Sequence, residues 1–185
     1  MLNIINEKNL LREKSKKFRK SLGANEKKKK DEIIFKKLIS SQEFISAENI
    51  LCYYSTCYEV ETLKIINYSL KVGKRVALPV CIDKSGLMQF RFISTIDELS
   101  EGAYGLKEPI NSNDVYTNEV NSICIIPALL VDENLVRLGY GKGYYDRFLS
   151  EFAGCKCVLC YKENIVEKLP VFNDFDVKCD ICITD

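Results

Sequence analysis

The stretch Arg137-Leu-Gly-Tyr-Gly-Lys-Gly-Tyr-Tyr-Asp-Arg147 places three glycines at alternate positions between two cations and runs directly into a helical pattern. Glycine adopts positive φ freely, so a loop of this kind can turn several backbone N–H groups toward one point. The start of the following helix adds partial positive charge, while Arg137 and Lys142 add formal charge. Asp146 offers an oxygen to a divalent cation. We therefore expect this stretch to bind a metal-bound polyphosphate.

Outward from this loop, short apolar runs alternate with amphipathic segments. The runs predicted to be strands cover residues 49–54, 74–78, 87–93, 122–126, 157–161 and 181–184. The segments predicted to be helices cover the N-terminal residues, about 27–39, about 62–72 and the residues from Tyr144 onward. Pro79 is expected to end the second strand. This alternation predicts one α/β domain over residues 1–185, with three layers: a largely parallel sheet and helices on both faces. Ligands of such sheets bind beyond the carboxyl ends of the strands, where the glycine loop would lie.

The first 30 residues carry eleven Lys and Arg against three Glu, although the whole chain has a net charge of only +1. At helical spacing, the apolar face comprises Ile4, Leu11, Phe18 and Leu22, and an adjacent cationic stripe comprises Lys8, Arg12, Lys16 and Arg19. One interpretation is a docked amphipathic helix with a solvated cationic side. The other is that Lys8 and Arg12 point into an anion site, while the remaining cations only solvate the helix.

The composition limits the chemistry that this chain can perform. Histidine is absent, which excludes Ser-His and Cys-His nucleophile pairs and histidine-containing zinc sites. The nine cysteines are an odd number, and Cys155-x-Cys157-x-x-Cys160 lies in a strand-like run whose successive side chains face opposite ways. Buried, reduced thiols are favoured there over a zinc site, and at Cys179 and Cys182 over a redox pair.

Length and hydropathy predict a globular protein. With 46% hydrophobic residues, a chain of 185 residues can bury a substantial core. Its apolar runs fall well short of the roughly 20 residues needed to cross a bilayer. The first residues also lack the order of charged, apolar and small residues found in a secretory signal. We therefore expect a cytoplasmic protein with no membrane partner.

The glycine loop differs from three common phosphate-binding patterns. A Walker A motif needs four residues between its glycines and Ser or Thr after the lysine, and neither condition is met. A dinucleotide-binding fingerprint needs a third glycine where Tyr144 stands. A protein kinase needs His-Arg-Asp and Asp-Phe-Gly elements, which the sequence lacks.

The stretch 137–147, preceded by Ile126-Pro127 and Asp132, resembles the signature of the 5-formyltetrahydrofolate cyclo-ligase family, also called methenyltetrahydrofolate synthetases. Four further elements match that family in order: Lys8-Asn-Leu-Leu-Arg12, Glu59-Val-Glu-Thr62, Gly105-Leu-Lys-Glu108-Pro109 and Asp176-Val-Lys-Cys-Asp180. Three positions depart from the family pattern: Ala128 and Leu135 where glycine is usual, and Phe175 where histidine is common. These departures concern local turns more than chemistry.

The resemblance implies an ATP-dependent ligase that converts 5-formyltetrahydrofolate to 5,10-methenyltetrahydrofolate, with the NagB/RpiA/CoA-transferase type of α/β fold. It implies an ATP site formed by Lys8, Asn9, Leu10, Leu11, Arg12, Arg137, Leu138, Gly139, Tyr140, Gly141, Lys142, Gly143, Tyr144 and Tyr145. It also implies a folate site formed by Tyr54, Glu59, Tyr140, Gly141, Lys142, Gly143 and Tyr144, and Mg²⁺ ligands at Asp146 and Asp176. Arg137 and Lys142 would act in catalysis by neutralising phosphoryl charge.

Some assignments stay open at this level. The resemblance gives Glu108 no role, and Asp180 is interpreted as a supporting or capping carboxylate. One alternative function is another ATP- or phosphate-binding enzyme of related α/β fold. A second is a nucleic-acid-binding module that uses the basic first 30 residues, which would leave the glycine loop unexplained. For the folate ligase we expect a monomer with a small-molecule substrate and no nucleic-acid partner.

Overall fold

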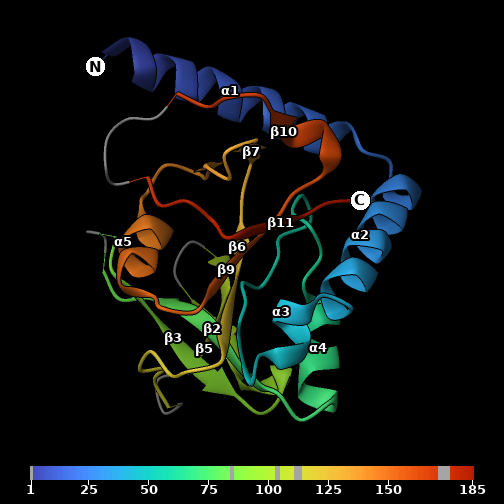
Figure 1. Ribbon diagram of the computed structural model, residues 1–185, viewed down its shortest axis with the longest axis vertical. Coiled ribbons are helices and arrows are strands. Elements are labelled where there is room, and N and C mark those ends of the chain that lie inside the picture. Colours follow the sequence, from blue (N-terminus) through green and yellow to red (C-terminus); the bar gives the residue numbers. More distant parts are fainter. Residues whose placement is uncertain (1, 84–85, 103–104, 111–113, 171–175) are drawn as a thin grey trace.

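The computed structural model describes residues 2–83, 86–102, 105–110, 114–170 and 176–185 (Figure 1). Within these residues the main sheet has six strands, in the spatial order β11 (Ile181–Ile183), β9 (Cys155–Leu159), β6 (Ser122–Pro127), β1 (Asn49–Leu51), β2 (Arg75–Cys81) and β3 (Met88–Ile93). All neighbouring strands are parallel except β2 and β3, which are antiparallel. The largely parallel sheet predicted from the sequence is therefore confirmed.

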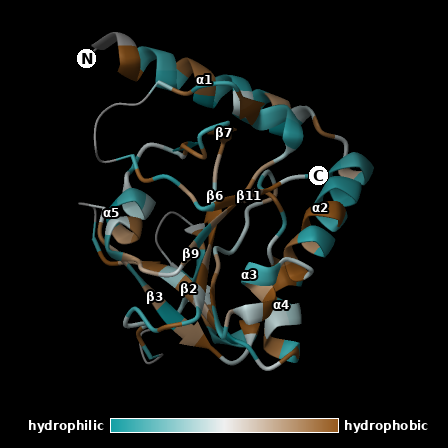
Figure 2. Cartoon of the chain, viewed as in Figure 1, coloured by the Kyte–Doolittle hydropathy of each residue, from teal (hydrophilic) through white to brown (hydrophobic). Residues whose placement is uncertain are grey.

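Helices cover both faces of this sheet. They are α1 (Leu2–Ser21), α2 (Ala24–Ile39), α3 (Gln42–Ser46), α4 (Leu63–Lys71) and α5 (Tyr144–Glu151). α2, α3 and α4 lie on one face, and α5 lies on the other (Figure 1). Strand alternation produces the two cores, because Ile123 and Ile125 of β6 pack on the α2 side while Cys124 and Ile126 pack on the α5 side. Figure 2 shows hydrophobic residues along the central strands and mixed colouring on α1 and α2. No helix in the described ranges is long and apolar enough to cross a membrane.

Two smaller sheets and two single turns complete the fold. They are the sheet β10 (Ile165–Val166), β7 (Leu130–Asp132) and β8 (Arg137–Leu138), the pair β4 (Leu99–Glu101) and β5 (Lys107–Pro109), and the 3-10 turns η1 (Ile96–Glu98) and η3 (Lys162–Asn164). α1 packs on the first of these sheets, where Leu11 joins an apolar cluster with β7 and β8. Ser15 Oγ donates to the Leu129 carbonyl at 2.7 Å, just after β6. α1 therefore crosses the molecule at the carboxyl ends of the parallel strands (Figure 1).

β2 continues to Cys81, so the prediction that Pro79 ends this strand is wrong. Proline is tolerated here because it lacks an N–H only on the side that faces β1, where there is no longer a partner strand. The Ala77 carbonyl accepts from Cys52 N at 2.9 Å on the β1 side, and Pro79 faces the same side two residues later. β1 has already ended at Leu51, earlier than predicted, so no ladder hydrogen bond is lost.

Candidate active site

A cavity of about 640 Å³ opens beyond the carboxyl ends of the parallel strands. Its walls come from α1, the segment after β1, the end of β2, β5 and the glycine loop after β8. The residues predicted for the site that line it are Lys8, Arg12, Tyr54, Glu59, Arg137, Leu138, Gly139, Tyr140, Gly141, Lys142, Gly143, Tyr144, Tyr145, Asp146 and Asp176. The fold thus brings together residues as far apart in the chain as Lys8 and Asp176.

Within the N-terminal motif, only Lys8 and Arg12 line the cavity. Leu10 is 73% exposed, and Leu11 packs into the apolar cluster between α1 and β7. Asn9 Oδ1 accepts from Arg12 Nη1 at 2.7 Å. Lys8 and Arg12 thus line the cavity, whereas Asn9, Leu10 and Leu11 do not, and the ATP site stays a prediction.

Two glycines of the loop have backbone conformations that favour glycine, because φ is 96° at Gly141 and 73° at Gly143. Gly143 is also the N-cap of α5. A Cβ at Gly141 would lie 3.0 Å from Cζ of Arg12, so glycine permits the guanidinium to approach the loop. Arg12 Nε donates to the Gly139 carbonyl at 2.9 Å. The loop and α1 thus form a cationic corner of the cavity, to which Lys142 adds a further charge.

The turn before the loop is built around Asp132 and Leu135. Leu135 has a φ of 62°, the left-handed conformation for which glycine is the usual residue. The Asp132 carboxylate accepts from Val136 N at 2.9 Å and from Leu169 N at 3.0 Å. These bonds hold the turn in spite of the departure at Leu135. The departure at Phe175 lies outside the described residues.

The two predicted Mg²⁺ ligands each contact a cation. Asp146 Oδ1 accepts from Arg137 Nη2 at 2.9 Å, and Asp176 Oδ2 accepts from Lys8 Nζ at 2.8 Å. Burial lowers the pKa of Arg12, and the charge of Asp176 opposes this shift. Among the described residues, no group of three or more Cys, Asp and Glu could hold a metal ion. A metal ion bound here would therefore need further oxygens, such as those of a phosphate.

Three residues that line the cavity each carry a buried polar atom without a hydrogen-bond partner among the described residues: Arg19 at Nε, Arg137 at Nε and Tyr145 at OH. Such groups are rare in folded proteins because burial removes their bonds to water. Arg137 is only 7% exposed, and its guanidinium carbon lies 5.6 Å from the ring centroid of Tyr145. The cavity wall therefore suits a ligand that supplies hydrogen-bond acceptors.

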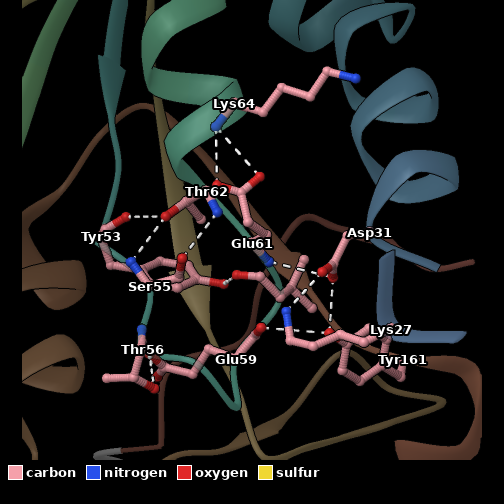
Figure 3. A network of polar contacts seen from close by, with 11 residues as sticks. Lys27, Asp31, Tyr53, Ser55, Thr56, Glu59, Glu61, Thr62, Lys64 and Tyr161 are labelled. Carbon is pink, nitrogen blue, oxygen red and sulfur yellow. Dashed lines mark hydrogen bonds and ion pairs between the residues drawn. The ribbon is translucent and has the colours of Figure 1, made fainter. Parts of the chain in front are cut away.

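Glu59 lies in a segment after β1 that side-chain hydrogen bonds hold in place (Figure 3). Its Oε2 accepts from Thr56 N at 2.8 Å and from Thr56 Oγ1 at 2.9 Å. Thr62 Oγ1 donates to the Tyr53 carbonyl at 2.6 Å and accepts from Ser55 N at 3.0 Å. Glu59 itself is 6% exposed and lines the cavity. A fixed carboxylate just after a strand is thus available to accept hydrogen bonds from the N–H groups of a ligand.

The prediction that Arg19 lies on the solvent-exposed side of α1 is wrong. Its side chain is buried, lines the cavity and donates from Nη2 to the Ala128 carbonyl. Burial raises the pKa of Tyr140, and nearby Glu59 adds to this rise while Arg19 opposes it. A signal was available in the sequence, since Arg19 follows Arg12 by two helical turns and therefore shares its face. Lys16 and Lys20 also line the cavity, although neither was expected there.

Two further acidic residues now have positions. Glu108, which the family resemblance left without a role, is 9% exposed and lines the cavity, where its Oε1 accepts from Cys81 N at 3.4 Å. Burial, with a contribution from Glu108, raises the pKa of Cys81 to about 11. Asp180 Oδ2 accepts from Lys156 N at 2.7 Å. Asp180 therefore caps the start of β9, as one part of its interpretation expected.

All nine cysteines are free. Cys157 and Cys160 are buried on β9 and just beyond it, as expected for core thiols. Burial raises the pKa of Cys155 to about 11 and that of Cys160 to about 12. These thiols are therefore protonated at neutral pH, which agrees with the favoured interpretation of the cysteine run.

Comparison with known proteins gives a consistent result. A family model described as the 5-formyltetrahydrofolate cyclo-ligase family matches residues 4–185. A probable 5-formyltetrahydrofolate cyclo-ligase of Schizosaccharomyces pombe is 28% identical over 166 residues, which are 82% of this chain and 81% of the relative. A mitochondrial 5-formyltetrahydrofolate cyclo-ligase of Arabidopsis thaliana is 29% identical over 80% of this chain and 59% of the relative. The NMR structure of Aquifex aeolicus 5,10-methenyltetrahydrofolate synthetase superposes with a TM-score of 0.85 at 27% identity, covering 95% of this chain and 88% of that chain.

Proposed function

This chain belongs to the 5-formyltetrahydrofolate cyclo-ligase family, and we propose how its own residues carry out the reaction of that family. It is an ATP-dependent ligase of folate metabolism that converts 5-formyltetrahydrofolate to 5,10-methenyltetrahydrofolate. The observation that carries the residue assignments is the cavity, because all five sequence elements of the family contribute to its lining. The nucleic-acid alternative gains no support, since Lys8, Arg12 and Arg19 of the basic N-terminal segment line this cavity.

The need for ATP follows from the chemistry of the formyl group. This group on N5 is an amide, so its carbon is a weak electrophile and its oxygen is a poor leaving group. In the proposed route the formyl oxygen attacks the γ-phosphorus of ATP, and ADP leaves. N10 then attacks the formyl carbon, the carbon–oxygen bond breaks, inorganic phosphate departs and N10 loses its proton. No step needs an enzyme nucleophile, which is consistent with a chain that lacks histidine.

We assign the phosphate end of the cavity to Lys8, Arg12, Arg137, Lys142 and the amides of the glycine loop. Positioned cations and N–H groups lower the barrier by neutralising charge on the transferring phosphoryl group. The partnerless Nε of buried Arg137 supports this assignment, because phosphate oxygens would supply its missing acceptor. Tyr145 OH, also without a partner among the described residues, would donate to the same ligand.

We assign the folate end to Tyr54 and Glu59, together with the part of the glycine loop from Tyr140 to Tyr144. The Glu59 carboxylate would accept N–H groups of the pterin ring. Its burial and its two bonds to Thr56 support this role, because a fixed acceptor selects a ligand with matching donors.

We propose Asp146 and Asp176 as the residues that hold Mg²⁺. Their carboxylates fit this ion, which prefers oxygen ligands and is usually held by one or two carboxylates and by phosphates of the substrate. When bound, Mg²⁺ supplies positive charge for the phosphoryl transfer. Arg137 and Lys8, which contact these carboxylates in the structure, would then exchange them for phosphate oxygens.

The test of this function uses purified protein, Mg²⁺-ATP and 5-formyltetrahydrofolate. We expect the absorbance of the methenyl product to rise, with equal amounts of ADP and phosphate released. Omitting ATP, or using an ATP analogue whose γ-phosphoryl group cannot be transferred, should abolish the product. ATP turnover that is independent of the folate would contradict the proposal and favour another phosphate-using enzyme.

We also propose that the protein is monomeric, cytoplasmic and free of nucleic acid. Size-exclusion chromatography tests the first point. Cell fractionation tests the second, for which the mitochondrial relative is the contrasting case. Binding to RNA or DNA that falls steeply with salt would contradict the third.

A further inference from the structure

Arg19 is the most deeply buried cation on α1, and no role in the reaction has been assigned to it. Its side chain is 3% exposed. Nη2 donates to the Ala128 carbonyl, which holds one side of the guanidinium against the segment after β6. Arg19 lines the cavity, and its buried Nε has no hydrogen-bond partner among the described residues. A buried, charged donor without a partner is costly, so this part of the wall suits a ligand that accepts a hydrogen bond.

A buried acceptor lies near this donor. β1 and β6 are neighbouring parallel strands, so the segment after β1 that carries Glu59 and the Ala128 carbonyl that holds Arg19 leave the sheet at the same edge. Both side chains line the cavity, and at Tyr140 between them the charge of Glu59 raises the pKa of the hydroxyl while that of Arg19 lowers it. Glu59 comes from the segment after β1 and is 6% exposed. One region of the cavity wall therefore offers a carboxylate acceptor and a guanidinium donor together.

This region is distinct from the phosphate end. Arg12 contacts the glycine loop through Gly139, whereas Arg19 lies seven residues further along α1. A helix rises 1.5 Å per residue, so the two positions are about 10 Å apart along its axis, on the same face. α1 thus directs one arginine to the loop and another to the neighbourhood of Glu59, at the end of the cavity assigned to folate.

We propose that the Arg19 guanidinium donates a hydrogen bond to the 4-oxo oxygen of the pterin ring. The N3–H and 2-amino groups beside this oxygen donate to the Glu59 carboxylate. This inference rests on the proposed function. One edge of a 2-amino-4-oxo ring carries two donors followed directly by an acceptor, which matches a carboxylate next to a guanidinium. Arg19 is then a specificity-determining residue, because a ring with an amino group at position 4 would present a donor to the guanidinium.

The experiment measures binding of two ligands, 5-formyltetrahydrofolate and its 4-amino-4-deoxy counterpart, to the wild-type protein and to Arg19→Gln. Loss of a hydrogen bond from a charged donor predicts that Arg19→Gln weakens binding of the 4-oxo ligand by roughly 10-fold or more. Binding of the 4-amino ligand should change by less than about threefold, so the preference for the 4-oxo ring falls. ATP affinity, measured on the same samples, should stay within about twofold of wild type.

Lys17→Gln is the matched control, because Lys17 is an exposed cation on the same helix that does not line the cavity. It should leave all three affinities unchanged. If Arg19→Gln fails to fold, Arg19→Lys replaces it, since lysine keeps the charge but lacks the Nε donor of a planar fork. The ratio of the two folate affinities then decides the question in the same way.

Two outcomes would overturn the inference. Equal weakening of both ligands would mean that Arg19 supports Glu59 without reading the 4-oxo group. Loss of ATP affinity with intact folate binding would assign Arg19 to the phosphate end. Failure of the proposed function is separately visible, because wild-type protein would then form no methenyl product whatever the variant binds.

Discussion

The Lys142 ammonium stands at the exposed side of the cavity, in the loop between Gly141 and Gly143. Its ordinary flexibility makes it suited to follow a phosphoryl group as charge moves during transfer. We expect Lys142→Ala to lower turnover by about 100-fold, the scale of losing one positioned donor to a transition state. Steady-state rates of methenyl formation measure this effect. Lys71→Ala, which removes an exposed cation at the end of α4 away from the cavity, is the control. A Lys142→Ala turnover within about threefold of wild type would remove lysine from the catalytic assignment.

The Asp146 carboxylate accepts a hydrogen bond from Arg137 in the structure, and we propose that it binds Mg²⁺ during the reaction. We expect Asp146→Asn to move the midpoint of the Mg²⁺ titration upward by about 10-fold, because an amide is a weaker ligand than a carboxylate. Activity measured against Mg²⁺ concentration at saturating ATP gives this midpoint. Asp180→Asn is the control, since Asp180 caps the backbone of Lys156 and should affect stability alone. An unchanged Mg²⁺ titration in Asp146→Asn would refute the ligand assignment.

Among the elements, the glycine loop and α1 depend on each other. Gly141 and Gly73 both have positive φ, at 96° and 80°, but only Gly141 lies against another element, the Arg12 guanidinium. Both Gly→Ala variants should lose roughly 1–2 kcal/mol of stability from backbone strain. Gly141→Ala should also weaken ATP binding by about 10-fold, because the added methyl group displaces Arg12. Thermal unfolding and nucleotide titration separate the two effects. Similar ATP affinity in both variants would argue against a phosphate corner shared by the loop and α1.

The elements that could be predicted from sequence are those with a local signal. Apolar runs in the sequence predict the parallel strands, and the end of the glycine loop predicts the start of α5. The short strands β4, β5, β7, β8 and β10 have only two or three residues each, too few for a periodic pattern. They exist because a partner strand pairs with them. Pro79 shows the same limit, since its tolerance in β2 depends on where β1 ends.

At the scale of the whole molecule, the cavity results from contacts between distant segments. The family resemblance assigned residues of the cavity from four of its five motifs, but it did not say how far along α1 the inward face continues. Arg19 illustrates the difference, because its burial depends on the Ala128 carbonyl, 109 residues away. The seven-residue spacing from Arg12 places Arg19 on the same face of α1, but nothing in the sequence indicates that the Ala128 carbonyl would hold it there. Charge alone therefore could not separate Arg19 from the exposed cations around it.

The last prediction concerns how α1 is fastened to the rest of the molecule. Ser15 is 1% exposed, and its Oγ donates to the Leu129 carbonyl at 2.7 Å and accepts from Asn164 Nδ2 at 2.8 Å. Ser15→Ala would leave a buried acceptor and a buried donor without this partner, so we expect a loss of about 1–3 kcal/mol in the free energy of unfolding. Urea denaturation measures the loss as a lower midpoint with an unchanged slope. Ser21→Ala removes an exposed hydroxyl that bonds within the same helix, to the Phe18 carbonyl, and should stay within about 0.5 kcal/mol of wild type. If the two variants were equally stable, the attachment of α1 would depend on its apolar contacts and on Arg12 and Arg19, and the buried serine would contribute nothing measurable.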